Sequence, residues 1–162
     1  MRDAQDIERA IDTHGSTVWR VCSLSISSSA DAQDAFQEVF LKYALNEATY
    51  RDDEHRKAWL IRVAINTCKD MLRAAHRKNV SLDESLENGR DSFVSHQESL
   101  GFAAREVLDA MDNLGDPPKT PVYLALYEGY TAPEIATMLD APVNTVYSWI
   151  ARGKQQLKEA LA

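Results

Sequence analysis

Residues 131–146 read TAPEIATMLDAPVNTV. Thr131 and Glu134 have the spacing of a capping box, which predicts that a short helix starts here. A tight turn at residues 140–142 follows, and a second helix is predicted from about Asn144. Two short helices joined by three or four residues form a helix-turn-helix. The apolar residues at helical spacing face the core of this module: Ile135, Ala136, Leu139, Val146, Ile150 and Leu157.

The turn and the preceding segment carry further local signals. Asp140 stands where this layout usually has glycine, and aspartate tolerates the left-handed backbone better than most residues. Small Ala136 suits a point where two helices cross closely. Upstream, Thr120 followed by Pro121 predicts the N-cap and first residue of a helix over Val122–Glu128, and Gly129 is a typical terminator.

The rest of the chain is also helical in pattern, with almost no period-2 alternation. A first helix runs from about Ile7 to Leu24 or Ile26, and a second, capped by Asp31, runs to about Tyr43. A polar loop, Asn46–Glu54, leads into a third helix from His55 to Lys78. The residues of this third helix predicted to face inward are Ala58, Ile61, Ile65, Cys68 and Leu72.

Helical periodicity stops between residues 80 and 101, where Ser, Asp, Glu, Asn and Gly dominate. We interpret this segment as a flexible acidic linker. Another helix is predicted from Phe102 to Leu114. The predicted fold class is all-α, with two small helical domains, 1–79 and 102–162, joined by the linker 80–101, the second domain being the helix-turn-helix.

A net charge of −7 taken alone argues against nucleic-acid binding, but the charges are unevenly distributed along the chain. Residues 1–79 hold twelve basic and twelve acidic side chains, and residues 55–79 alone hold seven basic side chains against Asp70. A local basic stripe can meet phosphates even when the whole chain is acidic. The stripe therefore adds a second candidate nucleic-acid surface.

Several classes of function lack their signatures. No phosphate-binding glycine loop or catalytic triad pattern is present, and the four histidines are scattered without ligand spacing. We expect no catalytic residues, no metal and no cofactor. Cys22 and Cys68 are expected to be buried, reduced thiols. Without an apolar signal or spanning segment, the protein is expected to be cytoplasmic, with no membrane insertion.

The predicted second helix of the helix-turn-helix has a polar face that suits the major groove of DNA. An ordinary solvated helix face is the alternative interpretation. The candidate DNA-binding residues of this module are Thr131, Asn144, Thr145, Tyr147, Ser148, Arg152 and Lys154.

Four runs of the sequence carry a family resemblance: DAQDAFQEVFLK (31–42), KAWLIRVAIN (57–66), EGYTAPEIA (128–136) and VNTVYS (143–148). They resemble the extracytoplasmic-function (ECF) sigma factors, small members of the sigma-70 family. The resemblance covers about residues 16–78 and 114–157, in the order of the family. It implies a promoter-specificity factor whose partners are promoter DNA and core RNA polymerase, through its β′ and β subunits. An anti-sigma protein that covers both domains is a further implied partner.

The resemblance also implies roles for particular residues. The second helix would dock on a coiled coil of β′ through Asp34, Gln37, Glu38 and Lys42. The third helix would face the melted −10 element, and the loop 46–54 would form a pocket for an unstacked base. We expect Trp59 to pack in the core rather than to stack on bases. The implied contacts to the −10 strand are Arg56, Lys57, Arg62, Asn66, Lys69 and Arg73, while the helix-turn-helix would bind the −35 element.

The chain departs from the family at its recognition helix. Tyr147, Trp149, Gln155 and Gln156 occupy positions that are often basic. Since each lost phosphate contact weakens DNA binding, we expect the C-terminal domain alone to bind DNA weakly. Two alternatives stay open from the residues: a dimeric helix-turn-helix repressor or activator, and a sigma-like adaptor that binds only proteins.

Overall fold

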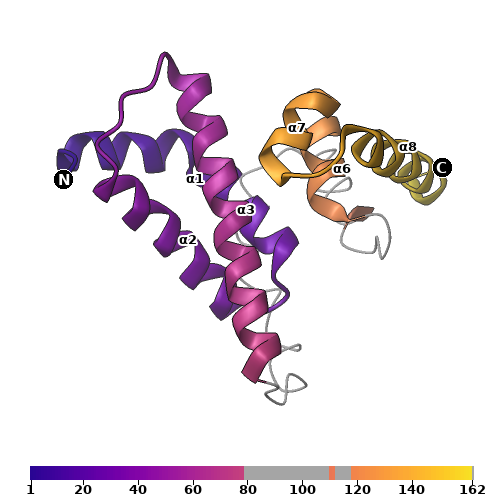
Figure 1. Cartoon of the computed structure of the whole chain (residues 1–162), viewed down its shortest axis with the longest axis horizontal. Coiled ribbons are helices and arrows are strands. Elements are labelled where there is room, and N and C mark those ends of the chain that lie inside the picture. Colours follow the sequence, from indigo (N-terminus) through magenta and orange to yellow (C-terminus); the bar gives the residue numbers. More distant parts are fainter. Residues whose placement is uncertain (79–109, 112–117, 162) are drawn as a thin grey trace. The chain divides into compact units, whose positions relative to one another are not determined.

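The computed structural model describes residues 1–78, 110–111 and 118–161 (Figure 1). Every regular element of these residues is a helix: α1 (Ala4–Ser25), α2 (Ser29–Leu45), α3 (Asp53–Lys78), α6 (Lys119–Leu126), α7 (Ala132–Leu139) and α8 (Val143–Leu161). The chain divides into two compact units, Met1–Val94 and Ser95–Ala162. The all-helical class is confirmed. The predicted linker 80–101 and most of the helix predicted from Phe102 lie outside the described residues.

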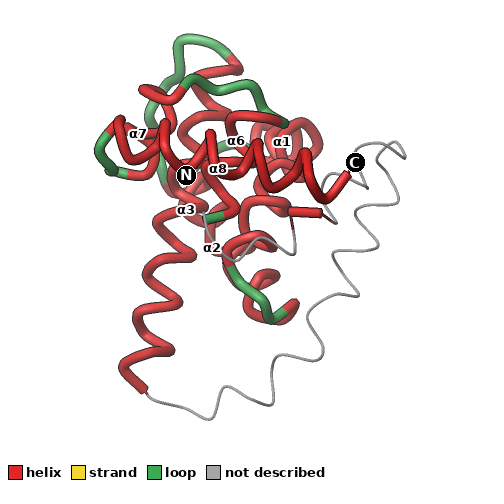
Figure 2. Tube along the Cα trace, turned by 90° about the vertical axis from the view of Figure 1, so that its right-hand side faces the viewer, coloured by secondary structure: helices red, strands yellow, loops and turns green. Residues whose placement is uncertain are grey.

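In the first unit α1, α2 and α3 all pack against one another (Figures 1 and 2). The amphipathic periodicity explains this, because each helix buries one apolar stripe. Each large aliphatic side chain buried in this way contributes roughly 1.5–3 kcal/mol. The fully buried residues are Val18, Val21, Cys22, Ala35, Val39, Tyr43, Leu60, Ile61 and Ala64.

Several details of the first unit differ from the predictions. Helix α3 begins at Asp53 rather than His55, so the loop is residues 46–52 and not 46–54, and α1 begins at Ala4 rather than Ile7. The N-cap of α2 is Ser28, whose hydroxyl accepts a hydrogen bond from the amide of Asp31. Asp31 therefore lies in the first turn, where its charge suits the helix dipole, and its prediction as the cap was wrong. Leu72 is 49 % exposed rather than buried. The reason is that the last turns of α3 project beyond α1 and α2 (Figure 2).

The second unit confirms the local signals of the helix-turn-helix. Thr131 and Glu134 form a complete capping box at the start of α7. Asp140 ends α7 with φ 53° and ψ 51°, in the left-handed region. Gly129, at φ 83°, follows α6. The core of this unit contains Met111, Val122, Tyr123, Leu124, Ile135 and Val146.

Helix α6 starts one residue before the predicted cap. It begins at Lys119, with Pro118 at the N-cap position and no side-chain cap hydrogen bond. Thr120 is thus not the cap. Pro121 is accommodated in the first turn because the amides there have no partner within the helix, so the missing N–H costs nothing.

A close contact between α6 and α8 forms at Gly153, which is buried. An ideal Cβ on this residue would lie 2.4 Å from Cγ2 and 2.8 Å from Cγ1 of Val122. The absence of a side chain therefore lets the two helices approach, and α8 is held in place by this contact.

Candidate nucleic-acid interface

The loop between α2 and α3, residues 46–52, is attached to the start of the chain through Arg2. The Arg2 Nε donates to the carbonyl of Tyr43 at 2.9 Å, and Nη2 donates to the carbonyl of Ala48 at 2.6 Å. Its Nη1 pairs with Asp6 at 3.2 Å, and the side chain is only 10 % exposed. One guanidinium thus connects the last turn of α2, the loop and α1.

Aromatic side chains lie beside this loop. Tyr43 and Tyr50 are stacked, with ring centroids 6.2 Å apart and an interplanar angle of 18°. The Trp59 ring lies 5.9 Å from Tyr50 and 6.0 Å from Tyr43. The Arg2 guanidinium carbon lies 4.2 Å from the centre of the Tyr43 ring, within the range of a cation–π contact. Trp59 is half-buried and packs against these two rings, at the edge of the core rather than within it.

A polar network links the three helices of the first unit. The Tyr43 hydroxyl donates to Asp6 at 2.7 Å and accepts from Arg56 Nε at 3.1 Å. Asp53 pairs with Arg56 and with the buried His14, each at 2.9 Å. The hydrogen bond from Tyr43 lowers the pKa of Asp6. The pKa of Asp53 is lowered by the hydrogen bond with His14.

This network bears on the candidates for contacts to the −10 strand. The Arg56 guanidinium already bonds Asp53 and Tyr43, so part of its hydrogen-bonding capacity is used within the protein. Residues 62, 66, 69 and 73 recur every three or four positions, and therefore share one face of α3. Arg62, Asn66 and Arg73 are exposed, and Lys57 and Lys69 are half-buried.

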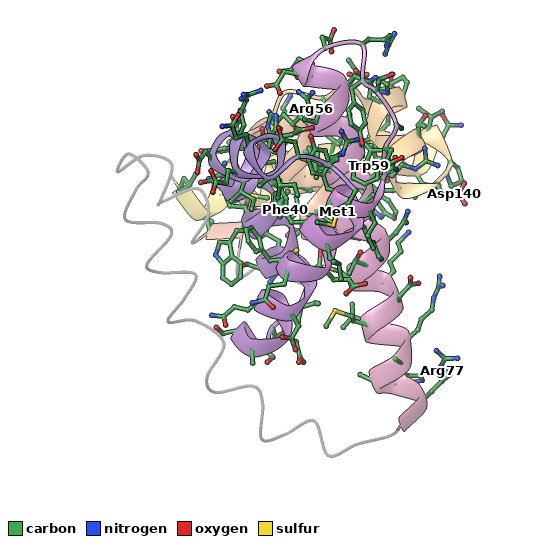
Figure 3. The ribbon with its side chains drawn as sticks, turned by 90° about the vertical axis from the view of Figure 1, so that its left-hand side faces the viewer. Met1, Phe40, Arg56, Trp59, Arg77 and Asp140 are labelled. Carbon is green, nitrogen blue, oxygen red and sulfur yellow. The ribbon has the colours of Figure 1, made fainter. Side chains whose placement is uncertain are left out.

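The basic stripe continues toward the end of α3. Arg56 and Trp59 lie near the start of this helix and Arg77 lies near its end (Figure 3). A surface hollow of about 570 Å³ is lined by Asp70, Leu72, Arg73, His76 and Arg77. Arg73 is 3.8 Å from Asp70, and both side chains are largely exposed. Basic side chains are thus present from the start of α3 to this hollow, where the Asp70 carboxylate offsets part of their charge.

The candidates for polymerase docking on α2 do not all share one environment. Asp34, Gln37 and Glu38 are exposed. The Lys42 ammonium instead donates to the Thr67 hydroxyl of α3 at 2.9 Å. Two residues that the sequence interpretation missed lie one and two turns further along the helix: Leu41, 53 % exposed, and Leu45, 63 % exposed.

On α8 most of the predicted contacts point to solvent. Asn144, Tyr147, Ser148, Arg152 and Lys154 are exposed, and Thr145 is half-buried. The Tyr147 side chain is 56 % exposed, although it is aromatic. Thr131 is exposed but its hydroxyl is used by Glu134 in the capping box.

Other chemistries find little support in the described part of the chain. It has no group of three or more His, Cys, Asp or Glu side chains able to hold a metal ion. None of its helices is both long and apolar enough to cross a membrane. Cys22 and Cys68 are free and buried, as predicted. The fold places them together, and the hydrogen bond that the Cys22 thiol donates to Cys68, with burial, raises the pKa of Cys22.

Comparison with known protein families gives a match for each of the two units. Residues 10–78 match Sigma-70 region 2, and residues 104–157 match Sigma-70, region 4. The two units therefore define a DNA-binding protein of the sigma-70 class. A repressor with an unrelated N-terminal domain would match in the second unit alone, so this alternative is not supported.

Individual relatives narrow the class. The chain is 32 % identical over 144 residues to the ECF RNA polymerase sigma-E factor of Haemophilus influenzae, covering 83 % of this chain and 76 % of the relative. It is 31 % identical over 146 residues to the RNA polymerase sigma-H factor of Pseudomonas aeruginosa, covering 84 % and 76 %. The chain belongs to the ECF sigma factors of the sigma-70 family. It is an RNA polymerase sigma factor, whose partners are core polymerase and promoter DNA.

Two solved structures share the fold. The sigma factor RpoE of Bartonella quintana, in complex with the anti-sigma factor NepR, superposes with a TM-score of 0.66 at 14 % identity, covering 98 % of both chains. CnrH, in complex with the cytosolic domain of CnrY, gives a TM-score of 0.57 at 20 % identity, covering 98 % of this chain and 89 % of the other.

Proposed function

We propose that the two units divide promoter recognition between them. The first unit docks on core polymerase through α2 and receives the melted −10 element along α3 and the loop 46–52. The second unit binds the −35 element with α8. The observation that supports this most directly is the exposed face of α3, where Arg62, Asn66 and Arg73 follow one another at helical spacing from a loop lined by aromatic rings.

The physical argument for the −10 surface concerns single-stranded DNA. A strand taken out of the duplex presents phosphates to cations and bases to hydrogen-bonding pockets. The exposed guanidinium groups of Arg62 and Arg73 suit the phosphates, and the Asn66 amide offers both a donor and an acceptor. Lys57, Lys69 and Arg56 lie on the same helix and complete the proposed contact set.

The docking surface on α2 is best described as an acidic and amide patch that ends in two leucines. Asp34, Gln37 and Glu38 complement a basic partner helix, and Leu41 and Leu45 add apolar area. Lys42 lies at the edge of this surface toward α3, and its bond to Thr67 fixes α2 against α3.

The −35 surface comprises the exposed first turns of α8, supported by the capping box of α7. Asn144 and Ser148 suit base edges, and Arg152 and Lys154 suit phosphates. Thr145, Tyr147 and the capping residue Thr131 complete this set. Domain limits of 1–79 and 102–162, with 80–101 as a linker, fit these assignments.

We further propose that the protein acts as an initiation factor without enzymatic activity of its own, in the cytoplasm with the polymerase. The complex of RpoE with the anti-sigma factor NepR supports an anti-sigma protein as a regulatory partner of this chain as well.

Co-elution with purified core polymerase and run-off transcription together test the roles proposed for the two units. Glu38→Lys with Leu41→Ala should abolish co-elution with core, whereas Glu8→Lys, an equal charge change at an exposed position of α1, should not. Arg62→Ala with Asn66→Ala should keep co-elution but lose opening of the −10 region, with Arg9→Ala as the matched control. Asn144→Ala should weaken selection at the −35 element only. Loss of co-elution in the α3 variant, or normal opening by it, would contradict the proposal.

A further inference from the structure

Arg2 lies outside every surface that the sequence resemblance singles out, yet it bonds both the end of α2 and the α2–α3 loop. Its side chain bonds the carbonyls of Tyr43 and Ala48, and its backbone amide donates to the carbonyl of Ala44 at 2.9 Å. The residue is therefore attached to both sides of the point where α2 ends and the loop begins.

The carbonyls at this point have room for a further donor. The Tyr43 carbonyl accepts a long bond of 3.3 Å from the Asn46 amide, which leaves a lone pair for Arg2, and carbonyls of the last turn carry the negative end of the helix dipole. A guanidinium offers five donors in a rigid plane, so it can satisfy a helix carbonyl and a loop carbonyl at once. A lysine ammonium has no such fork.

The Arg2 guanidinium also fixes the aromatic side of the loop. It lies over the rings of Tyr43 and Tyr50, at 4.2 and 5.2 Å from their centres. Asp6 bonds both Arg2 and the Tyr43 hydroxyl, so the position of Arg2 is itself determined by α1. The loop backbone and the Tyr50 ring are thus held in one arrangement before any DNA is present.

We propose that Arg2 is a positioning residue for −10 recognition, which holds residues 46–50 in the conformation that receives an unstacked base. This inference rests on the proposed function of the loop. Arg2 touches no DNA in this role. It acts by removing alternative loop conformations, which lowers the entropic cost of capturing the base.

Hydrogen–deuterium exchange of the free, full-length protein tests the positioning directly. Arg2→Met keeps an apolar stem but removes the guanidinium. The hydrogen-bonded amides of the loop, Asn46, Ala48 and Arg51, should then exchange about tenfold faster, because the loop opens more often without the charge-assisted bonds to its backbone. Arg2→Lys should give nearly the same increase. Arg9→Met, which removes one positive charge from an exposed position of α1, should leave the loop unchanged.

Transcription from a promoter library randomised in the −10 region then tests the consequence. Polymerase carrying the wild-type protein should enrich particular bases, and Arg2→Met should reduce this enrichment about tenfold while co-elution with core is retained. Unchanged loop exchange together with unchanged base enrichment would overturn the inference. So would faster exchange throughout α1, α2 and α3, because Arg2 would then stabilise the whole unit. If the wild-type protein shows no −10 preference, the proposed function fails, and the exchange result still decides whether Arg2 orders the loop.

Discussion

Gly153 offers a sharp test of how α8 is held against the rest of its unit. Replacing glycine by alanine inside a helix ordinarily stabilises it by about 1 kcal/mol. At this position the new methyl group would lie 2.4 and 2.8 Å from the two methyl carbons of Val122, whereas carbon atoms in contact normally lie about 3.5–4.0 Å apart. The Val122 Cβ is itself only 3.2 Å away, so rotation of that side chain leaves a close contact.

The expected magnitude follows from these opposing effects. Overpacking a buried site costs about 1–3 kcal/mol, and the large overlap at Val122 favours the upper half of that range. Subtracting the gain in helix propensity leaves a net loss of about 1–2 kcal/mol for Gly153→Ala. The opening equilibrium of the second unit should therefore rise roughly 5- to 30-fold.

Hydrogen–deuterium exchange of the full-length protein can measure this loss by segment. Amides of α6 and α8 should exchange faster in Gly153→Ala, while those of α1, α2 and α3 serve as an internal control. Val122→Ala should make room for the new methyl group. The double variant should therefore be more stable than the sum of the two single substitutions predicts, by about 1 kcal/mol or more. Slower exchange in Gly153→Ala alone would show that helix propensity dominates, and would refute the argument from close approach.

Three further predictions concern other parts of the chain. Asp140→Val should destabilise the second unit by about 1–2 kcal/mol, because a β-branched residue fits the left-handed region poorly, while Asp140→Gly should be neutral or stabilising in the same exchange measurement. The lowered pKa of Asp6 stabilises the first unit above the unfolded value of about 3.9, and this stabilisation is lost as pH falls through the folded value. As the pH is lowered below about 4, the urea midpoint of that unit should therefore decrease, and it should decrease less steeply in Asp6→Asn than in wild type. Finally, the free protein should not shift a duplex that carries only the −35 element at about 150 mM salt, because α8 offers few cations to phosphate; a tight, sequence-specific shift of that duplex would contradict the weak binding expected of the C-terminal domain.

Local sequence signals accounted for much of the second unit. The capping box of Thr131 and Glu134 and the left-handed Asp140 depend on a few neighbouring residues, so their conformations follow from local chemistry. The close approach at Gly153 depends instead on which residue of α6 lies opposite. No periodicity within α8 encodes that partner, and the sequence therefore gave no reason to single out Gly153.

The same distinction applies to the candidate site. Helical spacing predicted the buried face of α3 and so which of its side chains are exposed, whereas the docking candidates on α2 came from the family resemblance. The contacts of Arg2 with residues 43–50 and of Lys42 with Thr67 join distant parts of the chain, and only the packing of three helices brings them together. Leu41 and Leu45 were missed because isolated exposed leucines carry no signal until their neighbours are known.

The distribution of charge supports the proposal that the two units bind promoter DNA together on the polymerase. Residues 102–162 hold five basic and eight acidic side chains, so α8 offers few cations to phosphate. The affinity that such a surface lacks can be supplied by tethering, because a second contact made within one assembly benefits from a high effective concentration. Docking of α2 on polymerase would place both units on the same DNA and convert two weak contacts into one selective complex. A recognition helix poor in cations also binds nonspecific DNA weakly, since that binding is almost wholly electrostatic. The acidic second unit is thus compatible with promoter recognition, provided that the polymerase supplies the proximity.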